Sequence, residues 1–210
     1  MASQIPDVVI FRLPLYVRIL TLLAEENAEV VSSQELGARL WMTPAQIRKD
    51  LSYFGKFGKQ GKGYNIAQLR EELREILGLN REWCVALIGV GRLGKAILDY
   101  GMLALREFNI VAAFDIDPHQ IGRNVSGLMI QDLTELADTV KSQGIEICIV
   151  AVPPSQVQRA IDCVVDCGIK AILNYAPAAA RVPKDVRMQE VDPTLALQTM
   201  TYHLKSLGSP

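Results

Sequence analysis

The stretch that decides the fold runs from Trp83 to Asp115. It begins W-C-V-A-L-I-G-V-G-R-L-G-K-A-I (residues 83–97) and ends, beyond a predicted helix, on V-A-A-F-D (residues 111–115). Residues 84–88 are apolar, as in a strand that is buried on both faces. The stretch therefore predicts a strand, a glycine-rich turn, a helix over residues 93–105 and a second strand over residues 110–114.

Three glycines, Gly89, Gly91 and Gly94, follow the first strand in the spacing G-x-G-x-x-G. In the dinucleotide-binding fingerprint, the first glycine permits a tight turn and the second lets a pyrophosphate approach the backbone. The third lets the helix pack closely against the strand. The N–H groups and the dipole at the start of the helix would face that pyrophosphate. A glycine turn without a ligand can have the same spacing, so the spacing alone is a weak signal.

Asp115 ends the second predicted strand, 21 positions after Gly94. The fingerprint places an acidic residue there to bind the adenosine ribose. A carboxylate accepts a hydrogen bond from a 2′-hydroxyl but repels a 2′-phosphate, and the two following residues include no arginine. We therefore predict that the chain binds NAD(H) rather than NADP(H). The predicted cofactor-binding residues of this stretch are Gly89, Val90, Gly91, Arg92, Leu93, Gly94 and Asp115.

The composition is that of a folded protein with balanced charge. The chain has 210 residues, of which 50% are hydrophobic, and 22 basic and 23 acidic side chains give a net charge of -1. A polyanion would therefore have to bind a local basic surface. The N-terminus shows no signal-peptide pattern, and no apolar run reaches the ~18 residues of a membrane span. We expect one or two domains in a soluble, cytoplasmic protein.

Four cysteines, Cys84, Cys148, Cys163 and Cys167, lie in apolar segments and form no C-x-x-C motif. Cys163 and Cys167 share one helical face, which leaves a metal or redox pair as an alternative to ordinary buried thiols. We predict buried thiols and no metal site.

A helix is predicted over residues 7–26, where apolar residues recur at helical spacing. Pro14 either begins this helix or kinks it. Arg18 lies in the apolar face of this helix. The alternative to a functional role is a surface arginine that packs its aliphatic stem along the protein and keeps its charge in water.

Two short helices follow. The strings S-S-Q-E (residues 32–35) and T-P-A-Q (residues 43–46) are capping boxes, and the second has proline at the first helical position. They predict helices that run to about residues 41 and 54. Two helices joined by so short a turn form a helix-turn-helix.

Ile47, Leu51 and Phe54 share one face of the second of these helices and should point inward, which leaves polar residues outside. Arginine favours guanine and glutamine favours adenine in a major groove, although a solvated charged face would look similar. Residues 55–64 contain four glycines, three lysines and no acid, as expected for a β-hairpin wing beside a phosphate backbone. The net charge of residues 43–66 is +4, which favours DNA binding over a flexible basic loop. The predicted DNA-binding residues are Thr43, Gln46, Arg48, Lys49, Ser52, Lys56, Lys59 and Lys62.

The remaining segments alternate between helices and strands. A helix over residues 67–77 ends at Gly78, and residues 78–82 form a linker. Strands over residues 145–152, 171–175 and 186–191 and a helix over residues 154–167 predict a doubly wound parallel sheet. Ligands bind at the carboxyl ends of such strands. An equal alternative for the residues found there is that the prolines only shape the loops. The residues expected near the nicotinamide are Val152, Pro153, Asn174 and Pro177.

The last predicted helix is capped by Asp192, has Pro193 at its first position and runs to about residue 207. Its apolar residues cover more than one face, so we expect it to pack between two bodies.

Several strings together carry a family resemblance over nearly the whole chain. They are S-S-Q-E-L-G (residues 32–37), Q-I-R-K-D-L-S-Y-F-G (46–55), G-K-F-G-K-Q-G-K-G-Y-N (55–65), G-V-G-R-L-G (89–94) and F-D-I-D (114–117). With them the chain resembles the Rex family of redox-sensing transcriptional repressors. The resemblance implies an α/β protein with a winged helix-turn-helix domain (residues 1–78), a Rossmann domain for NAD(H) (79–191) and a C-terminal helix (192–210) exchanged within a homodimer. It also implies binding to double-stranded, palindromic operator DNA and release when the ratio of NADH to NAD rises.

The resemblance further implies a switch between the DNA-binding and cofactor domains, to which Arg18, Tyr100 and Asp192 would belong, with Tyr100 at the cofactor. Members often have a bulky apolar residue after that aspartate, which some use to reach the partner's nicotinamide pocket, whereas this chain has Pro193 there.

Two other functions use a similar fold. A dehydrogenase needs a proton donor or acceptor near the nicotinamide, whereas His119 is expected at the adenosine end and His203 in the last helix. The chain also lacks a Y-x-x-x-K pair, so we predict that it is not an enzyme. A CoA-binding module is a third alternative, which Asp115 disfavours.

Overall fold

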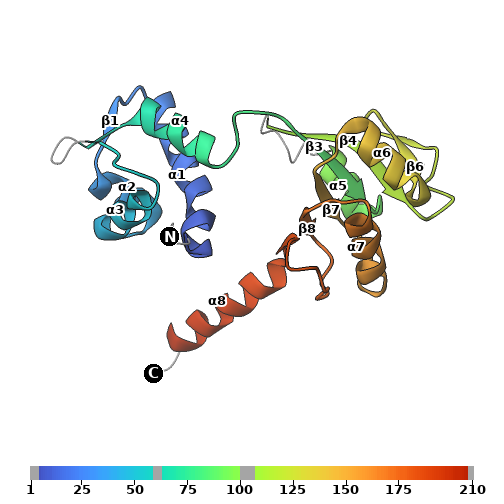
Figure 1. Ribbon diagram of the computed structural model, residues 1–210. Helices are drawn as coiled ribbons and strands as arrows, with labels where there is room; N and C mark the ends of the chain where they lie inside the picture. The colour runs from blue at the N-terminus through green and yellow to red at the C-terminus, as the bar shows by residue number, and fades with distance from the viewer. Residues whose placement is uncertain (1–4, 59–62, 100–106, 208–210) are drawn as a thin grey trace. The chain divides into compact units, whose positions relative to one another are not determined.

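The computed structural model describes residues 5–58, 63–99 and 107–207. The chain divides into two compact units, Met1–Arg81 and Glu82–Pro210 (Figure 1). Each unit has its own hydrophobic core.

The first unit is mainly helical. Its core gathers apolar side chains from every helix, such as Leu13, Leu36, Ile47 and Leu69, all of which are buried. The first helix continues through Pro14 instead of beginning there. Its elements are α1 (Asp7–Glu25), β1 (Val30–Val31), α2 (Ser33–Leu40), α3 (Pro44–Ser52), β2 (Tyr64–Asn65) and α4 (Ile66–Ile76).

The helix-turn-helix forms as its caps predict. The Ser32 hydroxyl accepts a hydrogen bond from Glu35 N at 3.0 Å, and the Thr43 hydroxyl accepts one from Gln46 N at 3.2 Å. Each bond satisfies an N–H group that the first turn of a helix leaves without a partner. Helix α3 ends at Ser52, two residues earlier than predicted.

The predicted β-hairpin over residues 55–64 is wrong in its first strand. Residues 55–58 form no strand, and β2 pairs instead with β1, antiparallel, in the register Val31 with Tyr64. Gly55 and Gly58 have φ angles of 144° and 71°, which are incompatible with regular extended pairing. Residues 59–62 lie outside the described part of the chain.

The second unit contains a sheet in the order β5-β6-β4-β3-β7-β8-β9. All neighbouring strands from β6 to β9 are parallel, which confirms the doubly wound Rossmann arrangement, and β5 adds an antiparallel edge. Its elements are β3 (Trp83–Ile88), α5 (Arg92–Asp99), β4 (Phe108–Asp115), β5 (Asn124–Val125), β6 (Leu128–Asp132), η1 (Leu133–Glu135), α6 (Leu136–Gln143), β7 (Ile147–Val150), η2 (Pro154–Gln156), α7 (Val157–Asp166), β8 (Ala171–Asn174), β9 (Arg187–Glu190) and α8 (Pro193–Leu207).

Both faces of the sheet are covered, since successive residues of a strand point to opposite faces. In β3, Val85 and Leu87 enter the core that includes α5, whereas Ala86 and Ile88 enter the core that includes α6 and α7. This two-sided burial explains why β3 is apolar throughout. The sequence did not predict β5, β6 or α6.

Helix α8 begins where predicted. Asp192 Oδ1 accepts a hydrogen bond from Thr194 N at 2.8 Å, and Pro193 is the first helical residue. Apolar side chains such as Leu195 (55% exposed) and Tyr202 (71% exposed) have little cover within this chain. Across the ranges that the structure describes, no helix has the length and apolar character of a membrane span.

Candidate cofactor and DNA-binding sites

The glycine turn between β3 and α5 is shaped by the missing side chains. Gly89 has φ 92°, and a Cβ there would lie 2.6 Å from Ala151 O. A Cβ on Gly94 would lie 2.0 Å from Gly89 O, so α5 could not approach the turn as closely with any other residue. A Cβ on Gly91 would meet nothing within 4 Å. The first and third glycines thus serve the fold, whereas the second leaves open space.

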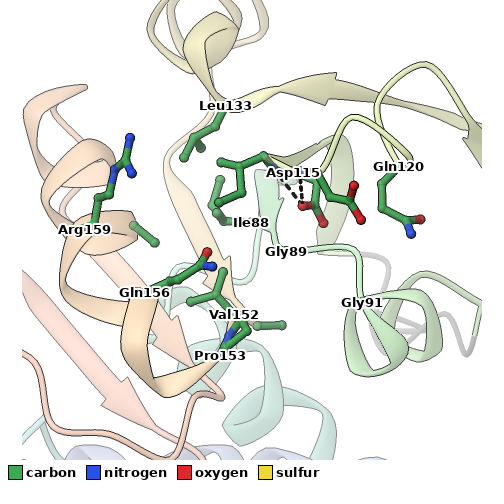
Figure 2. A pocket seen from close by; sticks show the side chains of 14 residues that line it. Ile88, Gly89, Gly91, Asp115, Gln120, Leu133, Val152, Pro153, Gln156 and Arg159 are labelled. Carbon is green, nitrogen blue, oxygen red and sulfur yellow. Dashed lines mark hydrogen bonds between the residues drawn. The ribbon is translucent and has the colours of Figure 1, made fainter.

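That open space belongs to a pocket of about 260 Å³ at the carboxyl ends of β3, β4 and β7 (Figure 2). The strand order reverses between β3 and β7, which is where doubly wound sheets bind their ligands. Five of the predicted cofactor residues line the pocket together: Gly89, Gly91, Asp115, Val152 and Pro153.

Asp115 connects the end of β4 to the glycine turn. Its Oδ2 accepts a hydrogen bond from Val90 N at 2.7 Å, and its Oδ1 accepts bonds from Ile116 N at 2.7 Å and Asp117 N at 2.9 Å. Val90 is itself buried, so it contributes its backbone N–H to this arrangement while its side chain packs in the core. The carboxylate is therefore held at the pocket, where it can accept a further bond from a hydroxyl group.

Several pocket residues were missed by sequence reasoning. Gln120 Oε1 is buried without a hydrogen-bond partner among the described residues, and Figure 2 shows it on the same side of the pocket as Asp115. On the other side the pocket is lined by Leu133, Gln156 and Arg159. The signal in the sequence that could have found Gln156 and Arg159 was their spacing of three residues, which places them on one helical face.

Not every predicted cofactor residue lines this pocket. Arg92 and Leu93 are exposed in the first turn of α5, and Gly94 is buried against the turn. Asn174 is buried, and its amide bonds its own loop: Nδ2 donates to Ala176 O and Ala178 O, each at 3.3 Å. Pro177 is exposed. These residues remain predictions, and Tyr100 lies outside the described residues.

The histidines that a dehydrogenase would need for proton transfer do not line the pocket. His119 is exposed in the turn beyond β4 and His203 is exposed on α8, and neither lines the pocket. Within the described ranges no three His, Cys, Asp or Glu side chains could share a metal ion. The four cysteines are free thiols, and burial raises the pKa of Cys148 and of Cys167, which keeps these thiols protonated.

A second candidate site lies in the first unit. A depression of about 740 Å³ runs between α3 and β2 and is lined by three of the predicted DNA-binding residues, Arg48, Ser52 and Lys56. Arg48 is exposed, and its Nη1 donates to the Ser33 hydroxyl at 2.9 Å. Lys49 is also exposed, outside this depression. Lys59 and Lys62 lie outside the described residues.

Gln46 and Asp50, one turn apart on α3, contact each other. Gln46 is half-buried, and its Nε2 donates to Asp50 Oδ1 at 2.6 Å instead of pointing freely outward. Asp50 is fully buried at 0% exposure and forms an ion pair with Arg12 of α1. The single acid of residues 43–66 is thus removed from the surface, which leaves that surface more basic than its net charge suggests.

Of the three residues of the expected switch, Tyr100 lies outside the described residues, and Arg18 and Asp192 lie in different units. Arg18 is exposed on α1, and its part in the switch stays a prediction. Asp192 is half-buried and caps α8 through Thr194 N.

Comparison with known proteins shows what kind of protein combines these two sites. The "Redox-sensing transcriptional repressor Rex" of Chloroflexus aggregans is 50% identical, over 97% of this chain and 96% of that protein. The chain belongs to the Rex family.

Other Rex proteins match at similar coverage. The "Redox-sensing transcriptional repressor Rex" of Syntrophobacter fumaroxidans is 40% identical over 99% of both chains. The crystal structure of RSP in complex with beta-NAD+ and operator DNA matches with a TM-score of 0.91 and 36% identity, over 97% of this chain and 94% of RSP. The structure of RSP with beta-NADH matches with a TM-score of 0.87.

Two family models match parts of the chain. Residues 4–52 match "Putative DNA-binding protein N-terminus" and residues 80–178 match "CoA binding domain". The first covers the helix-turn-helix. The second covers the glycine turn, Asp115 and the pocket, and so describes the same Rossmann unit that the Rex relatives share.

Proposed function

We propose that this chain is a transcriptional repressor that binds operator DNA as a homodimer and is released from it by NADH. The observation that carries the proposal is that one chain of the Rex family combines a helix-turn-helix bearing Arg48 with a Rossmann pocket bearing Asp115. RSP, which is similar over nearly its whole length, has been crystallised with operator DNA and with both redox forms of the cofactor. Such a repressor works in the cytoplasm, where operator DNA lies.

The residues of the pocket fit a dinucleotide. The open space over Gly91 and the first N–H groups of α5 suit a pyrophosphate, which those donors would bind and orient. Asp115 would accept a hydrogen bond from the adenosine ribose. Val152 and Pro153 would exclude water on the side of β7. When bound, the nicotinamide supplies two redox states whose ratio the protein can sense.

We propose NAD(H) in preference to CoA, although a family model that matches residues 80–178 is described as a CoA-binding domain. CoA carries a phosphate on its adenosine ribose, and the Asp115 carboxylate would repel that group as it would repel the 2′-phosphate of NADP. A competition experiment separates the two ligands: CoA should fail to displace NADH.

We also propose that the chain is not an enzyme, because neither histidine lies at the pocket and the relatives are named as repressors. Incubation with NADH and common ketones or aldehydes should give no turnover.

The deciding experiment measures operator binding at fixed total cofactor and varied ratios of NADH to NAD. A duplex selected from a random library supplies the operator. Affinity should fall as NADH replaces NAD and should recover when NAD is restored. An affinity that does not depend on the ratio would refute the redox response, and binding without sequence preference would refute the repressor function.

A further inference from the structure

The buried carboxylate of Asp50 accepts four hydrogen bonds. Oδ1 accepts hydrogen bonds from Arg12 Nη2 at 2.7 Å and Gln46 Nε2 at 2.6 Å. Oδ2 accepts bonds from Arg12 Nε at 2.6 Å and Tyr16 Oη at 2.5 Å. A carboxylate offers about four acceptor sites, so these four donors saturate it.

We propose that Asp50 fixes the orientation of the Gln46 amide and so decides which base edges α3 accepts in operator DNA. The proposal rests on the proposed function, since it concerns how the operator is read. Asp50 is a positioning residue in this scheme, because it acts on DNA only through Gln46.

The orientation of the amide follows from the chemistry of its partner. Burial raises the pKa of Asp50, but the hydrogen bonds from Arg12, Tyr16 and Gln46 outweigh burial and hold the pKa below its usual range. The group is therefore ionised and can only accept hydrogen bonds. The amide group that faces it must be the NH₂, because the opposite orientation would place two oxygens against each other without a proton.

The Oε1 of Gln46 is therefore the end of the amide that does not face Asp50. In the major groove the amino groups of adenine and cytosine are donors, whereas O6 and N7 of guanine and O4 of thymine are acceptors. An outward Oε1 matches an amino group and opposes a keto oxygen. The second N–H of the amide lies beside Oε1 and can donate to N7 of adenine, which makes adenine the preferred base.

The contact between Gln46 and Asp50 is not needed to join the helices. Arg12 and Tyr16 come from α1 and already connect it to α3 through three of the four bonds. Gln46 lies on α3 itself, one turn before Asp50. The fourth bond therefore orients the Gln46 side chain and is not needed to hold α1 against α3.

The test is Asp50→Asn, because asparagine keeps the shape but lets the Gln46 amide face it in either orientation. A selected operator is compared with duplexes in which each base pair is replaced in turn. The parent should prefer an amino-bearing base at one position of each half-site by about 5- to 150-fold, the range of a good bidentate contact. Gln46→Met, which keeps a similar stem, should lose that preference and identify the position.

In Asp50→Asn the preference at that position should collapse, while preferences elsewhere and the affinity for NADH are retained. Tyr16→Phe is the matched control, because it removes one bond to Asp50 without freeing Gln46, and it should keep the parental preference. A uniform loss of affinity in Asp50→Asn with the preference intact would overturn the proposal.

A second measurement does not depend on the stability of Asp50→Asn. The adenine at the identified position is replaced by purine, which lacks the amino group. The parent should lose affinity for that duplex and Gln46→Met should not, whereas equal affinities for adenine and purine in the parent would overturn the proposal. Absence of any sequence preference in the parent would instead refute the proposed function.

Discussion

Gly91→Ala should separate the stability of the Rossmann unit from its affinity for the cofactor. A methyl group at this position would meet nothing within 4 Å, and Gly91 is not among the glycines with positive φ. Alanine therefore fits the folded state and restricts the unfolded chain, which is worth ~0.4–1 kcal/mol of added stability. We expect the free energy of unfolding to stay level or rise.

The same methyl group occupies the space in which a pyrophosphate would approach the turn. Displacement of the phosphate would break at least one hydrogen bond from a backbone N–H. Such a bond to a charged group contributes ~1.5–3 kcal/mol. At ~1.4 kcal/mol for each factor of ten, NADH should bind about 10- to 150-fold more weakly. Calorimetric titration with NADH gives the affinity, and thermal unfolding without ligand gives the stability.

Gly94→Ala provides the contrast. Its Cβ would lie 2.0 Å from Gly89 O, a backbone atom that cannot move without opening the turn. This variant should lose stability and cofactor affinity together. If Gly91→Ala binds NADH as the parent does, the pyrophosphate does not pass over Gly91 and the assignment of the pocket is wrong.

Four further changes test other parts of the molecule. Arg48→Ala should weaken operator binding by ~1–3 kcal/mol, measured by fluorescence anisotropy, and leave NADH affinity unchanged; equal operator affinity would contradict its role. Asp115→Ala should weaken NADH binding and reduce the preference for NADH over NADPH, measured in parallel titrations. The substitution removes both the acceptor for the ribose hydroxyl and the negative charge that repels a 2′-phosphate. Since the folded-state pKa of Asp50 is lowered, its stabilisation is present above about pH 4 and is lost as the pH falls below that value. The protection factors of the α3 amides, which correct exchange rates for their intrinsic pH dependence, should therefore fall on acidification in the parent and change less in Asp50→Asn. Arg18→Ala, Asp192→Ala and the double variant should each respond less to NADH in operator titrations, with effects that do not add if the two side chains form a pair.

The glycine turn and Asp115 could be predicted because their signal is local. A tight turn, a close helix and a strand-terminal acid are all fixed by spacing within one β-α-β unit. The same reasoning explains the success at the helix caps, where Ser32 and Thr43 each bond a backbone N–H three residues ahead. Short-range geometry of this kind does not depend on the rest of the fold.

Gln120 and Arg159 could not be predicted in the same way. Gln120 belongs to the turn that leads from β4 toward β5, and Arg159 belongs to α7 beyond β7. They meet at one pocket only because β4 and β7 lie on either side of β3 in a parallel sheet. The missed strand β6 has a different cause, since only its first three residues are apolar and its last two are polar.

The burial of Asp50 was not predicted from the sequence, for another reason. A charged residue in a short amphipathic helix is normally assigned to the solvent face. The cost of burying this carboxylate is offset by Arg12, which lies 38 residues earlier in the chain. Its position beside Ile47 and Leu51 on the inner face of α3 was the signal that could have found it.

The two sites lie in separate units, so a response of DNA binding to NADH requires a coupling free energy between them. A ligand shifts such an equilibrium only by the difference between its affinities for the two states, and the coupling is reciprocal. The factor by which NADH weakens operator binding must therefore equal the factor by which operator weakens NADH binding. Gly91→Ala should leave the operator affinity of the cofactor-free protein intact, and Asp50→Asn should leave the coupling factor intact while base preference changes. A residue that acts in the switch itself should do the opposite: it should change the coupling factor in both titrations equally and leave each affinity, measured alone, close to that of the parent.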